Sequence, residues 1–144
     1  MGVSYTYFAA EDDTRAGAAV DDGPGDTLAP VVMAFDPVVQ ARTLMALLAD
    51  GAYDATTRDA DWARLVSPPD HEWAWVVSMP ASFTAALAEA TPERVAEVAV
   101  PWSRTDEFGG TASPEDLLPV LHSWRDLART TTARDLGLYC WTTL

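Results

Sequence analysis

The spacing of apolar and polar residues predicts β-strands at both ends of the chain. In residues 3–9, valine and tyrosine side chains occupy every second position from Val3, and this alternation in a β-rich composition is typical of a strand. Residues 72–78 contain alternating tryptophans followed by two valines, and residues 137–143 are rich in aromatic and β-branched side chains. We therefore expect strands in all three segments.

Capping residues followed by proline mark the starts of several helices. In Asp36–Pro37, Thr91–Pro92 and Ser113–Pro114, a side chain that accepts backbone hydrogen bonds precedes a proline, whose missing N–H is not needed in a first turn. In the last of these segments Pro119 conflicts with a straight helix, so either Asp116 is the cap or the helix bends. The expected helices are a short one after Glu11–Asp13 that ends near Gly23, and longer ones from Asp36 to near Gly51, from Pro80 to Ala90, from Thr91 to near Pro101 and from Ser113 through Ala128.

These elements together predict an α+β fold. We expect a single sheet of three to four mostly antiparallel strands, including the N- and C-terminal strands, covered by four or five helices that lie mostly on one face. Residues 52–71 and 102–110 show no clear period and are expected to be loops. The length of 144 residues is typical of one domain, so residues 1–144 are expected to form a single α+β domain.

The composition is strongly acidic. Asp and Glu number 22 against 9 basic residues, all of them Arg, and the formal net charge is -13. Lys, Asn and Ile have A/T-rich codons and are absent, which indicates a bacterial genome of high GC content, but codon bias does not explain so much Asp. The acidity therefore reflects function or a salt-loving host. Because an anionic surface repels nucleic acids and anionic lipids, we expect a basic protein partner, no nucleic acid and no membrane.

Residue types that carry catalysis or bind metals are scarce. The single cysteine, Cys140, cannot form an internal disulfide, and with two histidines it cannot complete a usual zinc site, so no cofactor is expected. His122 and Cys140 resemble a base and a nucleophile, but we expect a half-exposed histidine and a buried thiol. Asp54, Asp59 and Asp61 miss the spacing of a calcium loop. The free thiol and the lack of an apolar run of about 20 residues indicate a cytoplasmic protein.

The strongest candidate site is the segment between the last two expected helices. It brings together Trp102, Arg104, Asp106, Glu107 and Phe108, followed by two glycines that give the backbone freedom. Because tryptophan and arginine are frequent anchors of protein interfaces, these five residues are the predicted partner- or ligand-binding set. The opposite interpretation also stays open, namely that Trp102 and Phe108 hold a connecting loop on the core.

Four short motifs are spread over most of the chain. They are Met1-Gly2-Val3 with Tyr7-Phe8-Ala9, Phe35-Asp36-Pro37-Val38-Val39, Val98-Ala99-Val100-Pro101-Trp102-Ser103 and Leu138-Tyr139-Cys140-Trp141. Together they resemble a family of uncharacterised small acidic actinobacterial proteins, and the Met-Gly start with its early Tyr-Phe is loosely similar to the YfbM-like proteins. Neither resemblance implies functional residues for this chain.

Two functional hypotheses follow from these observations. The first is an acidic interaction protein, a monomer or homodimer, that engages a basic partner as an immunity-type antidote to a toxin would. The second is a small enzyme or ligand-binding domain whose site lies in residues 52–71 or 101–112. A deep apolar pocket with converging titratable side chains would favour the second hypothesis. The net charge and the missing catalytic motifs favour the first hypothesis over an enzyme, and the second stays open as the alternative.

Overall fold

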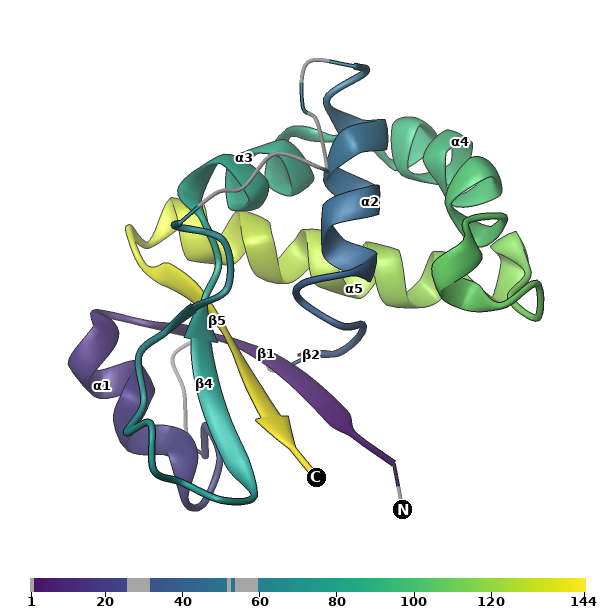
Figure 1. Cartoon of the computed structure of the whole chain (residues 1–144). Coiled ribbons are helices and arrows are strands. Elements are labelled where there is room, and N and C mark those ends of the chain that lie inside the picture. Colours follow the sequence, from purple (N-terminus) through teal and green to yellow (C-terminus); the bar gives the residue numbers. More distant parts are fainter. Residues whose placement is uncertain (1, 26–31, 52, 54–59) are drawn as a thin grey trace.

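The first and last strands of the chain pair with each other at the centre of a β-sheet (Figure 1). The structure, a computed structural model, describes residues 2–25, 32–51, 53 and 60–144. Within these residues one antiparallel sheet has the strand order β2-β1-β5-β4-β3. Its strands are β1 (Ser4–Ala10), β2 (Val32–Met33), β3 (Arg64–Leu65), β4 (Ala74–Ser78) and β5 (Gly137–Thr143).

The α+β class and the single antiparallel sheet are confirmed, and strands lie near both termini as expected. The expected number of three to four strands is too low, because the described residues form five. The two strands at the sheet edges, β2 and β3, are 2 residues long each. A period of two needs more residues than that to become visible in a sequence.

The helices of the described residues number five, with two additional 3₁₀ turns. They are α1 (Asp13–Gly17), η1 (Ala18–Val20), α2 (Gln40–Leu48), α3 (Ala81–Glu89), α4 (Pro92–Ser103), η2 (Asp106–Phe108) and α5 (Pro114–Ala133). The longest, α5, carries charged side chains along its length, and no described helix has the combination of length and apolar character that a membrane span requires.

The expected end of a helix near Pro101 is wrong, whereas the expected start of the last helix at Ser113 is confirmed and the alternative cap Asp116 is not used. Helix α4 continues through Pro101 to Ser103, and α5 continues through Pro119 with Ser113 rather than Asp116 as its cap. A proline removes one backbone hydrogen bond of a helix, and packing of the following turn can outweigh that loss. In α4 the following turn carries Trp102, which is completely buried.

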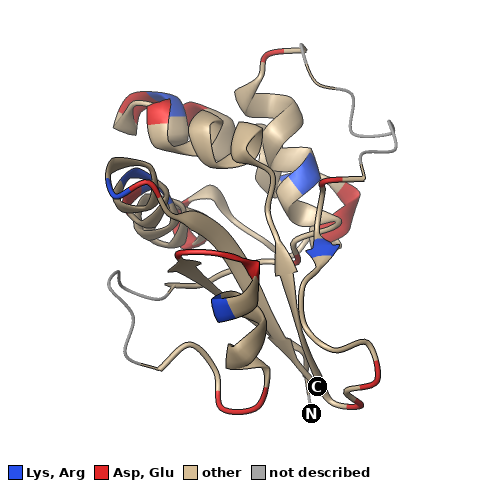
Figure 2. Cartoon of the chain, turned by 90° about the vertical axis from the view of Figure 1, so that its left-hand side faces the viewer, with Lys and Arg blue, Asp and Glu red and all other residues tan. Residues whose placement is uncertain are grey.

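Helices cover the two faces of the sheet unequally. Helices α2–α5 lie together over one face, whereas α1 with η1 lies against the other, as Figures 1 and 2 show from two directions. The main hydrophobic cluster lies under the larger layer, and a smaller cluster around Phe8, Val76 and Tyr139 lies under α1. The expectation that most helices share one face therefore holds for the described residues.

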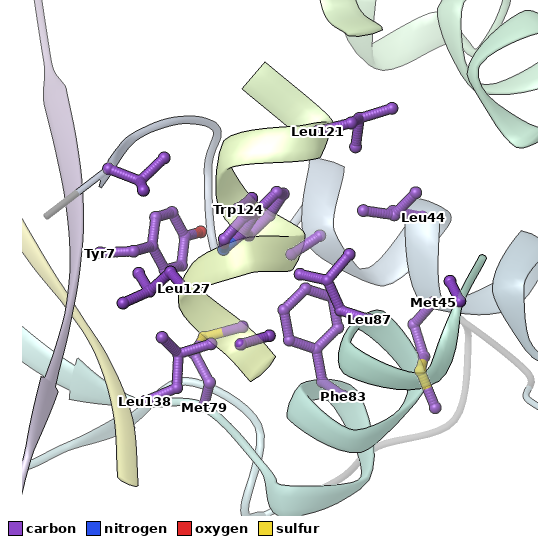
Figure 3. Packing of buried hydrophobic residues seen from close by; sticks show 14 of the residues in the cluster. Tyr7, Leu44, Met45, Met79, Phe83, Leu87, Leu121, Trp124, Leu127 and Leu138 are labelled. Atoms are coloured by element: carbon purple, nitrogen blue, oxygen red, sulfur yellow. The ribbon is translucent and has the colours of Figure 1, made fainter. Parts of the chain in front are cut away.

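Trp124 of α5 occupies the centre of the main cluster (Figure 3). Its ring lies 4.6 Å from Tyr7 of β1 and 5.3 Å from Phe83 of α3, measured between centroids. Within the described residues its indole N–H has no hydrogen-bond acceptor, a cost of about 1–3 kcal/mol that the packing of the ring offsets. Trp124 thus joins sheet and helices by contact alone.

Asp36 anchors the chain before α2 to strand β1. One carboxylate oxygen accepts hydrogen bonds from the backbone N–H groups of Val38 and Val39 at 2.7 and 2.9 Å, and the other accepts one from the Tyr5 hydroxyl at 3.0 Å. The Asp36 N–H in turn donates to the Gln40 side chain at 3.0 Å, which resembles the reciprocal arrangement of a capping box. The predicted helix start at Asp36 is too early, because the regular α-helix begins at Gln40 with Val39 as its N-cap, and Asp36 instead caps the turn that precedes it.

Replacing Asp36 tests this anchor. We expect Asp36→Ala to lower the free energy of unfolding by about 1–2 kcal/mol, because three hydrogen bonds lose their acceptor, and Asp36→Asn to lower it less. Urea denaturation followed by circular dichroism measures both changes. The exposed Asp22 supplies a matched control, since Asp22→Ala should stay within about 0.5 kcal/mol of the native protein. Equal midpoints for Asp36→Ala and Asp22→Ala would contradict the anchoring role.

Candidate functional site

The predicted site around Trp102 is built with its aromatic residues turned inward. Trp102 is 0% exposed, and its indole N–H donates to the Gln40 carbonyl at 3.0 Å and lies 3.1 Å from the Thr43 hydroxyl. The Phe108 ring packs edge to face on Trp102 with centroids 4.9 Å apart, and both rings contact Phe35. Trp102 therefore has no exposed surface for a partner. Its position agrees with the other interpretation, in which it holds the segment on the core.

The charged members of the same predicted set lie on the surface. Arg104, Asp106 and Glu107 are all exposed, and Asp106 and Glu107 belong to the 3₁₀ turn η2. The structure thus splits the predicted set into an aromatic pair that serves packing and three charged side chains that remain available to a partner. The segment from Pro101 onward is also more regular than the expected loop, because it contains the end of α4 and η2.

Cys140 is not placed to act as a nucleophile. Its thiol is 0% exposed within β5, and its sulfur lies 3.9 Å from the Thr142 hydroxyl. Burial raises the pKa of this thiol to about 12, so it stays protonated at neutral pH. His122 lies half-buried on α5. The expected buried thiol is therefore what the structure contains.

Metal binding finds no support in the described part of the chain. No group of three or more His, Cys, Asp or Glu side chains there is arranged to hold an ion. Three aspartates were compared with a calcium-binding loop. Of these, Asp61 is described and exposed, whereas Asp54 and Asp59 lie outside the described residues.

An open hollow lies beside the end of β4, and two of its lining residues, Asp61 and Arg64, belong to residues 52–71, which the second hypothesis named. It encloses about 480 Å³ and is lined by Asp61, Arg64, Ser78 and Ser82, among others. The Arg64 guanidinium is already bound at 2.8 Å to Asp13, which has a lowered pKa chiefly because of this hydrogen bond. The hollow is open, and Met79, Pro80 and Ala81 lie beside the polar residues of its lining, so it is not a deep apolar pocket.

Three exposed apolar residues lie at the end of the sheet where β1 and β4 begin and β5 ends. Trp73, Leu144 and Val3 are 47%, 59% and 46% exposed. The backbone N–H of Leu144 donates to the Trp73 carbonyl at 3.0 Å, and Val3 precedes Ser4, which pairs with Thr143, so the three residues form one row across the end of the sheet. We call Trp73, Leu144 and Val3 the terminal patch. It lies at the end of the sheet that points away from α2–α5 (Figure 1).

A fixed histidine supports the Trp73 ring. The His71 ring packs edge to face on Trp73 with centroids 4.7 Å apart. Its Nδ1 accepts a hydrogen bond from the Ala74 N–H at 3.2 Å, and its Nε2 lies 3.1 Å from a carboxylate oxygen of Asp21. With both ring nitrogens engaged, His71 has one orientation, which in turn restricts Trp73.

Exposed carboxylates contact His71 or flank it in the sequence. The Asp21 side chain is 74% exposed although it contacts His71, and Asp70 and Glu72, which flank His71 in the sequence, are exposed as well. We call Asp21, Asp70 and Glu72 the acidic rim. The sequence predicts Trp73 only as part of the strand expected over residues 72–78 and points to no site there. The signal that could have found it is a tryptophan that directly follows the run Asp70-His71-Glu72.

Comparison with known proteins identifies no relative, since no family model, no curated protein and no solved structure matches this chain. The resemblance to small actinobacterial proteins and to YfbM-like proteins therefore stays a prediction.

The buried thiol gives a testable prediction on reactivity. At pH 8 we expect Cys140 in the folded protein to react with a disulfide reagent such as dithionitrobenzoate only through unfolding, because the thiol is buried and its pKa is raised. The reaction rate should therefore rise with urea in step with the unfolded fraction. Fast labelling in the absence of urea would contradict the burial of Cys140.

The same pKa shift predicts how stability depends on pH. The folded pKa of Cys140, about 12, lies above the ordinary value of 9.0, so its contribution to stability is complete below pH 9 and is lost as the pH rises toward 12. Tyr5, with a pKa raised to about 12 mainly by burial, acts in the same direction above pH 10.0. Thermal unfolding at increasing pH measures this loss, and Cys140→Ala should make the decline between pH 9 and 10 shallower.

Proposed function

We propose that this protein is an acidic interaction protein that binds a basic protein partner, as an immunity-type antidote binds its toxin. The single observation that carries the proposal is the contrast between the two kinds of charge. Several arginines bind groups of the protein itself, whereas most of the described Asp and Glu side chains are exposed. An anionic field of this kind attracts a cationic partner over distances longer than a contact and speeds association.

Two arginines serve as caps of helix C-termini. Arg94 donates to the Leu47 carbonyl at the end of α2 at 3.0 Å, and Arg125 donates to the Ala90 carbonyl just after α3. The Arg125 side chain is only 12% exposed. Guanidinium groups at helix C-termini satisfy free carbonyls and interact favourably with the helix dipole. These positive charges are therefore held by the protein's own backbone.

Other arginines are engaged with neighbouring side chains. Arg64 is bound to Asp13 at 2.8 Å, and Arg15 lies 3.4 Å from Glu11. The Arg42 guanidinium lies over the Trp62 ring, 5.5 Å from its centroid. Figure 2 marks Asp and Glu on the loops near both termini, and no Lys or Arg of the described residues lies there. The described loops at this end of the molecule are thus acidic without a neighbouring basic residue.

The alternative of a small enzyme or ligand-binding domain would use the open hollow at Arg64 or the segment of residues 101–112. In the hollow, however, the Arg64 guanidinium is already ion-paired with Asp13 at 2.8 Å. In the segment, the aromatic side chains are spent on packing. These features favour the interaction hypothesis.

A pull-down from the native lysate at low and high salt tests the proposal. The tagged protein should retain basic proteins at low salt and release them at high salt, because screening shortens the Debye length from about 10 Å at 0.1 M to about 3 Å at 1 M. A variant with four exposed carboxylates neutralised, Asp70→Asn, Glu72→Gln, Asp106→Asn and Glu107→Gln, should retain less. Recovery of no basic protein at low salt would remove the basis of the proposal.

A further inference from the structure

We propose that the terminal patch and its acidic rim form a docking surface for an arginine side chain of the basic partner, with the guanidinium stacked on Trp73 and bound by rim carboxylates. The inference rests on the proposed function and extends it, because it names the surface and the chemistry that the partner presents. It also places the binding site away from the predicted segment around Trp102, at the end of the sheet where the chain termini lie (Figure 1).

The exposed ring is what distinguishes this surface from a mere accumulation of negative charge. Carboxylates alone attract any cation, whereas an indole face prefers a planar, weakly hydrated guanidinium that can stack on it. Trp73 is 47% exposed, and it stands next to Leu144 and Val3, whose exposed side chains offer apolar contact to the aliphatic part of an arginine. Ring and apolar neighbours together therefore favour arginine over lysine.

The contacts of Trp73 orient the ring before a partner binds. Its carbonyl is fixed by the Leu144 N–H, and its ring rests on His71, which is itself held by Ala74 and Asp21. A side chain that is already restricted loses less conformational freedom on binding, so more of the stacking energy appears as affinity. Asp21 thus has two roles, since it holds His71 and leaves most of its carboxylate exposed to a cation.

Charge decides between a basic partner and a second copy of this chain. An exposed apolar row at a sheet end would also suit a homodimer. In a symmetric dimer, however, each rim of Asp21, Asp70 and Glu72 would approach an equally charged rim, and each chain carries a net charge of -13. A cationic segment meets the same surface with complementary charge. We therefore commit to the basic partner.

Two peptides of equal length and charge test the inference, one with alternating arginine and glycine and one with alternating lysine and glycine. Isothermal titration calorimetry at low salt should give the arginine peptide roughly fivefold higher affinity. In Trp73→Leu, which keeps an apolar side chain but loses the ring, this preference should fall to near one. Circular dichroism and urea denaturation confirm that the variant is folded.

Two charge-matched variants locate the site. Asp70→Asn with Glu72→Gln should lower the affinity for the arginine peptide several-fold. Asp106→Asn with Glu107→Gln removes the same charge at the segment around Trp102, and it should lower the affinity for both peptides slightly and equally. Met33→Ala is the apolar control, because Met33 is 66% exposed and lies on β2 at the sheet edge. It should leave the preference for arginine unchanged.

The outcomes separate the inference from the proposed function. If both peptides bind in a salt-dependent way but Trp73→Leu keeps the arginine preference, the docking surface is wrong and the acidic interaction protein stands. If neither peptide binds at low salt, both fail. If sedimentation shows a dimer that Trp73→Leu converts to a monomer, the patch joins two copies of this chain and the inference is overturned.

Discussion

Strand β5 lies between β1 and β4 and is paired with both, so the sheet depends on residues from the end of the chain. Its pairing with β1 joins Ser4 to Thr143 and Ala10 to Gly137, and such distant contacts carry a large cost of loop closure. Helix α5 immediately precedes β5 and packs on β1 through Trp124 and Tyr7. Once this contact forms, β5 is held close to its position in the sheet. Helices α2–α5 can then cover one face of the sheet and α1 the other.

The unequal helix layers set the character of the surface. Over the larger layer, arginines are drawn into the fold because the ends of α2 and α3 present free carbonyls close to Arg94 and Arg125. At the opposite end of the sheet, the described loops carry carboxylates and no Lys or Arg. The net charge of -13 is therefore distributed in a way that composition alone does not reveal. This distribution connects the fold to the proposed binding of a basic partner.

The fate of two tryptophans shows how far a candidate site can be derived from sequence. Trp102 and Trp73 both stand beside charged residues, and the sequence favours Trp102 because two glycines follow the segment. In the fold, Phe35 and the start of α2 cover Trp102, whereas the end of the sheet leaves Trp73 half exposed. Burial depends on which distant element packs on a side chain. That information is not contained in the neighbouring residues of either tryptophan.

Local signals in the sequence determined the three longer strands, the approximate positions of the helices, the α+β class and the strongly acidic charge, since alternation, caps and composition act over a few residues. Tertiary structure decided the short edge strands β2 and β3, the passage of α4 and α5 through Pro101 and Pro119, and the exposure of Trp73. Each of these depends on contacts between residues far apart in the chain. The energy of such contacts exceeds the local preferences that a sequence displays.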